Sequence, residues 1–252
     1  MSPFPKKSFD KLSKVEETNW WFRSRNNILV WVFQTKSPSF KNFLEIGCGT
    51  GFVIQKLSRH FHFASFEGIE YFEEGLIFAR ERVPTAKFSV VDVTKMKLNQ
   101  AYDAIGSFDV LEHIEDDTTA LNNISEALKP GGSLVITVPQ HKWLWSTADE
   151  YACHARRYSK AEIHSKVKKS GLIVEYSTSF VTLLLPLMWV SRLFKRKKIT
   201  DPMAEFKISR GFNWLLEVIM KIEFFLLKSG IHFRAGGSIL VFASKPQLKF
   251  SK

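Results

Sequence analysis

Three glycines at alternate positions, Gly47, Gly49 and Gly51, follow a short apolar run over residues 43–46 and precede a helical stretch over 52–60. Glycine lets the backbone adopt positive φ and lets a ligand come close to the main chain. The free N–H groups at the start of a helix then face a ligand that lies on the turn. A buried strand, a tight glycine turn and a helix start therefore predict a nucleotide-binding loop.

The glycine spacing excludes the two common phosphate-binding loops. A dinucleotide loop has the pattern G-x-G-x-x-G, but here the third glycine comes one residue early and Phe52 stands where the last glycine is needed. The Gly-Lys-Ser/Thr of a P-loop is also missing from this turn. The pattern E-x-G-x-G-x-G instead resembles motif I of the class I S-adenosylmethionine (SAM)-dependent methyltransferases. The resemblance implies that the turn holds the methionine and ribose part of SAM, and a plain glycine turn is the alternative. The residues that it implies for the cofactor are Glu45, Gly47, Cys48, Gly49 and Gly51.

Two acids further along the chain each end a predicted strand. Glu70 ends the strand over 62–70, about 20 residues past the glycine loop, where a carboxylate can accept both ribose hydroxyls of a nucleotide. Gly68-Ile69-Glu70 matches the Gly-x-Asp/Glu of the family's second strand, and Glu67 is the competing acid. In the family, the acid at the end of the third strand contacts the adenine amino group, and an apolar neighbour covers the ring. Asp92 and Val93 fit those two roles, and a surface or capping acid is the alternative at both strand ends.

The stretch Asp109-Val110-Leu111-Glu112-His113-Ile114 follows the predicted strand over 102–108. It resembles the motif after strand four of many small-molecule methyltransferases, including those that act on ubiquinone precursors. The methyl group should emerge at this point, and the resemblance implies that Phe108 and Asp109 contact the cofactor. His113 is the candidate catalytic base, because its unperturbed pKa suits proton uptake near neutrality. A structural histidine at the strand–helix turn is the alternative.

Asp109, Glu112 and His113 also allow a second interpretation. D-x-x-E-H resembles the E-x-x-E-H of ubiquinone O-methyltransferases, in which the acids and the histidine can hold a divalent metal. Here Asp replaces the first Glu and shortens that arm. The prediction therefore includes no metal.

A polar and aromatic loop follows the predicted strand over 133–139 and runs from His141 to Tyr158. It resembles the W-L-W-S…D…H-x-R-R-Y segment of one branch of methyltransferases, and we expect it over the acceptor side of the site. Arg156 and Arg157 are candidates to hold a carboxylate or phosphate of the acceptor. His141 and His154 compete with His113 as the base. The alternative is a packed loop whose arginines pair with Asp149 and Glu150.

The elements that must position these residues alternate along the chain between apolar strands and helices. Strands are predicted over 43–46, 62–70, 87–93, 102–108, 133–139, 172–179 and 237–243, and helices over 15–33, 52–60, 72–82, 159–170, 180–190 and 212–227. One more helix is predicted after Asp116 and Asp117, with its end near residues 129–132. This order predicts an α/β fold with a doubly wound, mostly parallel sheet and right-handed crossovers. Ligands bind at the carboxyl ends of such strands, where the glycine loop and the acids fall. The resemblance implies the Rossmann-like, seven-stranded methyltransferase sheet, here with a helical insertion between the last two strands.

The domain prediction separates residues 1–40, an N-terminal helical lid, from residues 41–252, the methyltransferase domain that includes a hydrophobic and basic helical insertion over 180–231. Within the lid, Arg25 lies close in sequence to several aromatic residues and is the candidate to pair with the SAM carboxylate. A helix that packs on the sheet with solvated arginines is the alternative.

Composition limits the partners and the compartment. The formal net charge of +11 favours an anionic partner. The two cysteines, Cys48 and Cys153, exclude a disulfide framework and suit a reducing cytosol. The N-terminal residues 1–10 contain prolines and lysines but no apolar core, unlike a secretory signal. A cytoplasmic location is therefore expected.

The insertion contains two apolar runs, over 180–190 and 212–227, separated by the basic cluster Lys195–Lys198. Neither reaches the roughly 20 apolar residues that span a bilayer. Apolar segments flanked by tryptophan and basic residues favour helices that lie in the interface of an anionic membrane. A helical hairpin that covers the acceptor pocket is an equal alternative, and both hold if the acceptor is lipid-like. Contact between copies of the chain is a third possibility.

The predicted function is transfer of a methyl group from SAM to a small or lipid-like acceptor, at oxygen, by an in-line displacement that a positioned base assists. Two alternatives stay open. The charge suggests nucleic-acid methylation, but the N/D-P-P-Y/F motif is missing after the fourth strand, so nucleic acid is not expected as a partner. The other alternative is a non-catalytic SAM-fold module that binds a membrane or a protein.

Overall fold

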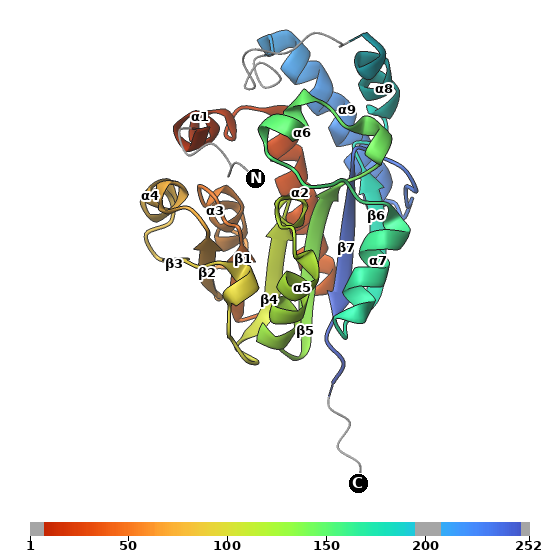
Figure 1. Cartoon of the computed structure of the whole chain (residues 1–252). Helices are drawn as coiled ribbons and strands as arrows, with labels where there is room; N and C mark the ends of the chain where they lie inside the picture. The colour runs from red at the N-terminus through yellow and green to blue at the C-terminus, as the bar shows by residue number, and fades with distance from the viewer. Residues whose placement is uncertain (1–7, 195–207, 248–252) are drawn as a thin grey trace.

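The structure is a computed structural model that describes residues 8–194 and 208–247 (Figure 1). Within these residues, one sheet is formed by β1 (Asn42–Ile46), β2 (Ser65–Glu70), β3 (Lys87–Val90), β4 (Tyr102–Phe108), β5 (Leu128–Pro139), β6 (Ile173–Phe180) and β7 (Ser238–Ser244). The strand order is β3-β2-β1-β4-β5-β7-β6. The first five strands are parallel, and β7 runs antiparallel to both of its neighbours. This topology confirms the predicted doubly wound, Rossmann-like sheet.

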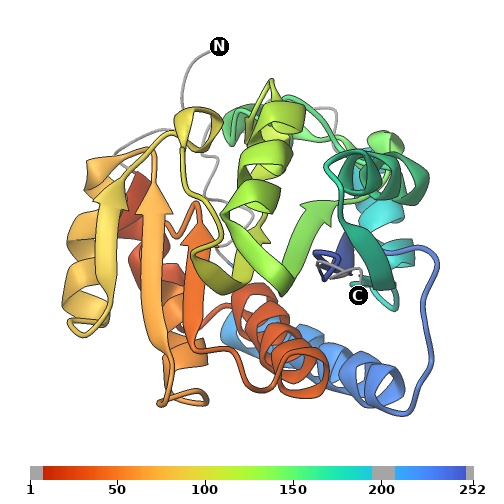
Figure 2. The same cartoon turned by 90° about the horizontal axis from the view of Figure 1, so that it is seen from below.

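Helices cover both faces of the sheet. The α-helices are α1 (Ser8–Val15), α2 (Trp20–Lys36), α3 (Phe52–Ser58), α4 (Glu73–Arg82), α5 (Asp117–Ala127), α6 (Thr147–Tyr151), α7 (Lys160–Lys169), α8 (Leu185–Phe194) and α9 (Arg210–Lys228). Three 3₁₀ turns are η1 (Val93–Lys95), η2 (Leu111–His113) and η3 (Lys142–Leu144). Seen from below in Figure 2, α2 and α9 lie on one side of the sheet and α5 on the other.

The hydrophobic core has two layers because successive strand residues point to opposite faces of a sheet. Phe43 packs in the layer formed with α2, α3, α4 and α9, while the next residue, Leu44, packs in the layer formed with α5 and α7. Leu240 and Val241 divide between the two layers in the same way on β7. The nearly continuous apolar strands of the sequence are thus buried on both faces, as parallel strands usually are.

The predicted single helix over 15–33 is wrong in its first part. The chain forms two helices instead, α1 and α2, with a joint over residues 16–19. Asn19 begins the second helix, since its side chain accepts a hydrogen bond from the Trp21 N–H at 2.9 Å. Asparagine is among the best N-cap residues. The hydrophobic periodicity of the region runs through this cap, so periodicity alone does not reveal the joint.

The expected helix end over 129–132 also differs from the structure. Strand β5 already begins at Leu128 and continues through this Lys-Pro-Gly-Gly stretch to Pro139. The register between β4 and β5 shifts between Tyr102 and Ala104. With this shift in register, residues 129–132, which were expected to end a helix, form part of the strand instead.

Two helices, α8 and α9, lie between β6 and β7 in the chain. The predicted basic cluster over 195–198 lies outside the described residues. Helix α9 packs beside α2, as Figure 2 shows. Polar contacts join them, because the Asn213 side chain accepts from the Trp20 N–H at 2.9 Å and donates to the Thr18 carbonyl at 3.0 Å. Helix α9 is therefore fastened to the joint between α1 and α2.

Glu223 on α9 holds the chain that leaves β6. Its fully buried carboxylate accepts the main-chain N–H groups of Thr182 at 2.7 Å and Leu183 at 2.8 Å. Burial raises the pKa of Glu223, and the backbone hydrogen bonds act in the opposite direction. One side chain thus satisfies two donors at the start of the insertion.

Replacing Glu223 with Ala should lower the free energy of unfolding by roughly 2–3 kcal/mol, because two buried N–H groups lose their acceptor. Urea denaturation followed by circular dichroism measures the change. Lys221→Ala, on the exposed side of the same helix, is the matched control and should change stability by about 0.5 kcal/mol or less. Equal losses in the two variants would contradict the role given to Glu223.

Candidate active site

A cavity of about 760 Å³ opens at the carboxyl ends of β1, β2 and β4. Its walls come from α1, α2, the glycine loop, the ends of these strands and the turn η2. Most of the residues predicted for the cofactor line it, and His113 lines it too. Those predicted cofactor residues are Arg25, Glu45, Gly47, Cys48, Gly49, Glu70, Asp92, Val93, Phe108 and Asp109.

Gly51 is the predicted cofactor residue that does not line the cavity. It is the N-cap of α3, with φ +75°, and a Cβ there would come within 3.0 Å of Ala79 on α4. The backbone conformation and the close packing both require glycine. Gly51 thus shapes the turn from behind the cavity.

Gly47 brings the loop close to the turn after β4. Its φ is +65°, and a Cβ would lie 2.5 Å from a Val110 methyl group. Any other residue would force the two loops apart. The first glycine of the motif therefore sets the distance between the two cavity walls.

Glu70 joins the glycine loop to the end of β2. One carboxylate oxygen accepts the Gly49 N–H at 3.0 Å, and the other accepts the N–H groups of Tyr71 at 2.8 Å and Phe72 at 3.2 Å. Burial raises the pKa of Glu70, and these three hydrogen bonds oppose the rise. The competing acid Glu67 instead accepts the Tyr102 hydroxyl at 2.8 Å and does not line the cavity.

Glu45 lies beneath the glycine loop with 3% of its surface exposed. Burial raises its pKa well above the usual value, and the positive charge of Arg25 lowers it again in part. Among the described residues, Oε2 of Glu45 has no hydrogen-bond partner. A buried acceptor of this kind is suited to a cationic donor on a bound ligand.

Arg25 reaches the cavity from α2 and pairs with Asp109. Nη1 of the arginine lies 2.6 Å from Oδ2 of Asp109, which also accepts the Thr137 hydroxyl at 3.1 Å. The guanidinium carbon lies 4.7 Å from the centre of the Trp21 ring. The Nε of Arg25 has no acceptor among the described residues. The arginine is thus held in place by protein groups and keeps one donor for a ligand.

Asp92 follows β3 and caps the turn η1. Its carboxylate accepts the Thr94 N–H at 3.0 Å and the Thr94 hydroxyl at 2.7 Å. Burial raises the pKa of Asp92, but these bonds and the nearby Lys95 outweigh it and hold the pKa below its usual value. The neighbouring Val93 is buried at the cavity wall. The acid and the apolar residue are therefore adjacent at the cavity, as predicted.

His113 occupies the far wall, beyond Asp109. Burial, and after it the neighbouring His154, lower its pKa to about 3, against the opposing effect of backbone hydrogen bonds at Ala152 and Asp109. The rings of His113 and His154 meet edge to face, with centres 4.6 Å apart. A base with so low a pKa accepts a proton weakly near neutral pH.

The arginines of the loop after β5 are engaged within the fold. Arg157 is buried and donates to both carboxylate oxygens of Asp149, at 2.7 and 3.0 Å, and Arg156 pairs with Asp117 at 2.9 Å. Neither arginine lines the cavity, so the expectation that they hold the acceptor is wrong. The packed-loop alternative is the arrangement found, with Asp117 in place of Glu150 as one partner.

Of the three histidines considered as the base, His141 lies apart from the other two. His141 stacks on Trp143 with ring centres 5.1 Å apart and lies outside the cavity lining. The Nδ1 of His154 lies 2.8 Å from Asp149, and its ring contacts His113. His154 thus stands directly behind His113.

Several cavity residues have no counterpart among the predicted site residues. Phe9 and Leu12 of α1 line the cavity, as do Tyr71 and Phe72, which follow Glu70 directly. Arg82 holds helix α1 there, because it donates to the Ser13 carbonyl at 3.0 Å and pairs with Glu16, directly after the helix, at 3.0 Å. Tyr71 and Phe72 could have been predicted as cavity residues, because they directly follow Glu70, which had been identified from the sequence. The short helix α1 carries no motif that would have indicated a place at the cavity.

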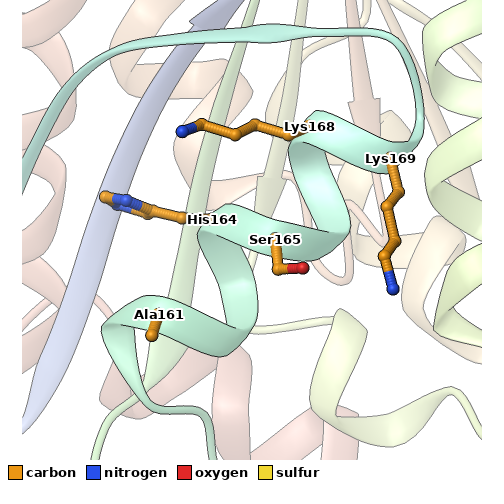
Figure 3. A pocket seen from close by; sticks show the side chains of 5 residues that line it. All are labelled: Ala161, His164, Ser165, Lys168 and Lys169. Carbon is orange, nitrogen blue, oxygen red and sulfur yellow. The ribbon is translucent and has the colours of Figure 1, made fainter.

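A second hollow lies on helix α7. Figure 3 shows its lining side chains, Ala161, His164, Ser165, Lys168 and Lys169, all from this one helix. It contains none of the predicted site residues and no acid. The cavity at the strand ends is therefore the candidate active site.

Comparisons with known proteins agree on one family. A family model described as a methyltransferase domain matches residues 21–177. The chain is 32% identical over 106 residues to a trans-aconitate 2-methyltransferase of Variovorax paradoxus, and this match covers 42% of the chain and 41% of that protein. It is 24% identical over 153 residues to a ubiquinone biosynthesis O-methyltransferase of Rickettsia canadensis, covering 54% of the chain and 64% of that protein. The matched part spans 39–64% of the length of the first curated relatives.

A solved structure shares the fold. Phosphoethanolamine N-methyltransferase 2 of Haemonchus contortus, determined in complex with S-adenosyl-L-methionine, superposes with a TM-score of 0.59 and 21% identity. The superposition covers 88% of this chain and 53% of that chain.

Asp117, at the start of α5, should stabilise the packed loop in a pH-dependent way. It accepts from Lys166 at 2.7 Å and from the Tyr158 hydroxyl at 2.7 Å, in addition to its pair with Arg156. Burial raises the pKa of Asp117, but these partners together hold it below the usual value of 3.8. A lowered pKa contributes stability above that value, and the contribution is lost as the pH falls through the folded-state pKa. Asp117→Asn should therefore lower the free energy of unfolding by roughly 1–3 kcal/mol at neutral pH, and the difference from the natural chain should shrink below about pH 4.

Urea titrations at several pH values measure the effect. Glu126→Gln is the control, because Glu126 is exposed on the same helix, α5. A difference that stays constant down to low pH would contradict the ion-pair explanation.

Proposed function

The chain belongs to the methyltransferase family whose model covers residues 21–177, and from that premise we propose that it transfers a methyl group from SAM to a small or lipid-like acceptor at oxygen. SAM is the cofactor of the proposed reaction and supplies the methyl group on its sulfonium centre. The residues of this chain bind and orient the two reactants. We also propose the predicted division into a lid over residues 1–40 and a methyltransferase domain over 41–252, and a cytoplasmic location.

The observation that carries the proposal is the gathering of the strand-end residues around one cavity. In the proposed binding mode, Glu70 accepts the ribose hydroxyls, and Asp92 with Val93 recognises the adenine. Glu45 and Arg25 both line this cavity, and each has a buried polar atom without a partner among the described residues, an acceptor on Glu45 and a donor on Arg25. An amino-acid end with one ammonium and one carboxylate is complementary to that pair. These residues therefore fit the cofactor.

The wall beyond Asp109 is the proposed acceptor side, with His113 facing the cavity. In-line transfer needs the acceptor oxygen aligned with the methyl group, which depends on positioning. The relatives include an O-methyltransferase, which supports oxygen as the accepting atom. The catalytic role of His113 remains a proposal. Its low pKa favours the neutral ring, which can orient an acceptor hydroxyl by a hydrogen bond.

The non-catalytic module is the alternative that has to be distinguished, since one fold serves many functions. Such a module would keep the fold without a working cofactor site. Nucleic-acid methylation is the other alternative, and it would require binding that weakens steeply with salt.

Calorimetric titration with S-adenosylhomocysteine tests the cofactor site. The natural chain should bind with micromolar affinity, and Glu70→Ala should weaken binding by about 30–100-fold, because two charge-assisted hydrogen bonds to the ribose are lost. Glu67→Gln, on the same strand but outside the cavity, should leave the affinity unchanged. Circular dichroism verifies that each variant is folded. A folded natural chain that fails to bind would overturn the enzyme proposal and favour the non-catalytic module.

An exposed apolar surface supports the proposed contact with an anionic membrane. None of the helices in residues 8–194 and 208–247 has the length and apolar character to cross a bilayer. Leu216, Met220 and Leu227 of α9 are buried, yet other large apolar residues of α8, α9 and their flanks are exposed. Those exposed residues are Leu183, Leu187, Trp189, Val190, Phe212, Trp214, Leu215, Ile222, Phe225 and Ile231. We name these ten residues the insertion surface. Exposed tryptophan and phenylalanine on a chain of charge +11 suit an interface with anionic lipid.

Sedimentation with lipid vesicles tests this contact. The natural chain should bind vesicles with anionic lipid more tightly than neutral ones. The double change Trp214→Ser and Phe225→Ser should weaken binding at least about tenfold, because two apolar side chains no longer enter the lipid. Ile77→Ser, at an exposed apolar position on α4, is the control and should not change binding. Unaltered binding by the double variant would contradict the proposal, and a loss of self-association in its place would favour contact between copies.

A further inference from the structure

Glu16, directly after helix α1, is a buried acid of the cavity that the proposed binding mode leaves unused. It lines the cavity together with Phe9 and Leu12 of α1, and 5% of its surface is exposed. Glutamate is rarely buried in a folded chain unless a partner compensates its charge. The contacts of Glu16 therefore decide whether it serves the fold alone or also a ligand.

One oxygen of the Glu16 carboxylate is engaged within the fold. Oε2 accepts from the Thr50 hydroxyl and from Nη1 of Arg82, the latter at 3.0 Å. Among the described residues, no donor reaches the second oxygen, Oε1. An ionised carboxylate can accept hydrogen bonds on both of its oxygens. Glu16 thus keeps Oε1 for a ligand in the cavity.

Arg82 of α4 fixes the position of this carboxylate. Besides Glu16, its guanidinium donates to the Thr50 carbonyl at 3.0 Å and to the Ser13 carbonyl at 3.0 Å. These bonds join the end of α1 to the residue between the last two glycines of the loop. Because Glu16 is held in place before a ligand binds, little conformational entropy is lost on binding.

Glu16 lies near the two residues proposed for the amino-acid end of the cofactor. Burial raises the pKa of Glu16 and of Glu45, and the charge of Arg25 is among the effects that lower both. The charge of Glu16 also raises the pKa of Glu45. Since charges interact most strongly at short distance, these mutual effects place the three groups close together. Glu16 is therefore a second acid at that end of the cavity.

We propose that Glu16 is a further cofactor-binding residue, whose Oε1 accepts a hydrogen bond from the ammonium group of the amino-acid end. This inference rests on the proposed function, because it takes SAM as the cofactor. An ammonium group has three donors, so Glu16 and Glu45 can both accept from it. Because Glu16 directly follows α1, a bound amino-acid end also holds this helix against the glycine loop.

Calorimetry with two ligands separates a contact with the amino-acid end from a purely structural role of Glu16. S-adenosylhomocysteine carries this end, whereas 5′-methylthioadenosine has the same adenosine and sulfur without it. Glu16→Gln should weaken the binding of S-adenosylhomocysteine by at least about tenfold, because one charge-assisted hydrogen bond is lost. Its affinity for 5′-methylthioadenosine should equal that of the natural chain.

A third ligand, S-adenosyl-3-thiopropylamine, distinguishes the ammonium from the carboxylate, because it keeps the first group and lacks the second. Glu16→Gln should weaken its binding by the same factor as that of S-adenosylhomocysteine. Competition against S-adenosylhomocysteine measures the ligands that bind too weakly for direct titration.

Glu17→Gln is the matched control. It removes the same charge at the next position, and Glu17 also pairs with Arg82, at 3.6 Å, but it is exposed and lies outside the cavity lining. This variant should bind all three ligands like the natural chain. Circular dichroism verifies that each variant is folded. Glu16→Asp, whose shorter side chain withdraws the oxygen, gives the same comparison if Glu16→Gln does not fold.

The outcomes separate this inference from the proposed function. An equal loss for 5′-methylthioadenosine means that Glu16 only shapes the cavity, and it would overturn the inference. Full affinity of the variant for S-adenosylhomocysteine, or an equal loss in Glu17→Gln, would overturn it too. A natural chain that does not bind S-adenosylhomocysteine would instead overturn the proposed function itself, and the inference with it.

Discussion

The carboxylate of Glu70 accepts three main-chain hydrogen bonds and so joins the glycine loop after β1 to the chain after β2. Both segments leave the sheet at the same edge, because β1 and β2 are parallel neighbours. The bridge adds to the other contacts that hold the loop, such as the Cys48 N–H, which donates to the Ile69 carbonyl at 3.0 Å, and Arg82, which donates to the Thr50 carbonyl at 3.0 Å. The position of the glycine-loop wall therefore depends on this acid, while Gly47 sets how close that wall comes to the turn after β4. Glu70 can also contact a bound ligand, because it lines the cavity.

Buried acids and arginines determine the electrostatic environment of the cavity. Glu45 and Glu16 are buried acids whose pKa values burial raises, and Arg25 and Arg82 lie beside them. Each arginine is tied to a protein carboxylate, so neither is a free cation that would repel a positively charged ligand. The walls are thus prepared to receive a cation with the least rearrangement of protein groups. For the proposed cofactor, which is a cation before transfer and neutral at sulfur afterwards, the same environment favours binding of the reactant over the product.

The part of the site that could be predicted is the part carried by strand ends. Glu70, Asp92 and Asp109 each follow an apolar run, and parallel topology brings such ends together whatever the intervening helices do. The loop after β5 could not be placed in this way: the pairing of Arg157 with Asp149 was only the alternative to an acceptor role, and the contact of His154 with His113 was not predicted. Both contacts depend on how this long loop folds back on η2. The joint between α1 and α2 could not be predicted from hydrophobic periodicity, because a single cap residue, Asn19, marks it within an otherwise continuous apolar pattern.

Asn213 of α9 contacts the chain on both sides of that joint, through the Thr18 carbonyl and the Trp20 N–H. Arg23 and Glu217 add an ion pair between α2 and α9 at 3.2 Å. A displacement of α9 therefore strains the residues that hold α1 over the cavity. Because free-energy coupling between two sites is reciprocal, a partner that displaced α9 on binding the insertion surface would change the affinity of the cavity for its ligand, and the ligand would change the affinity of that surface by the same factor.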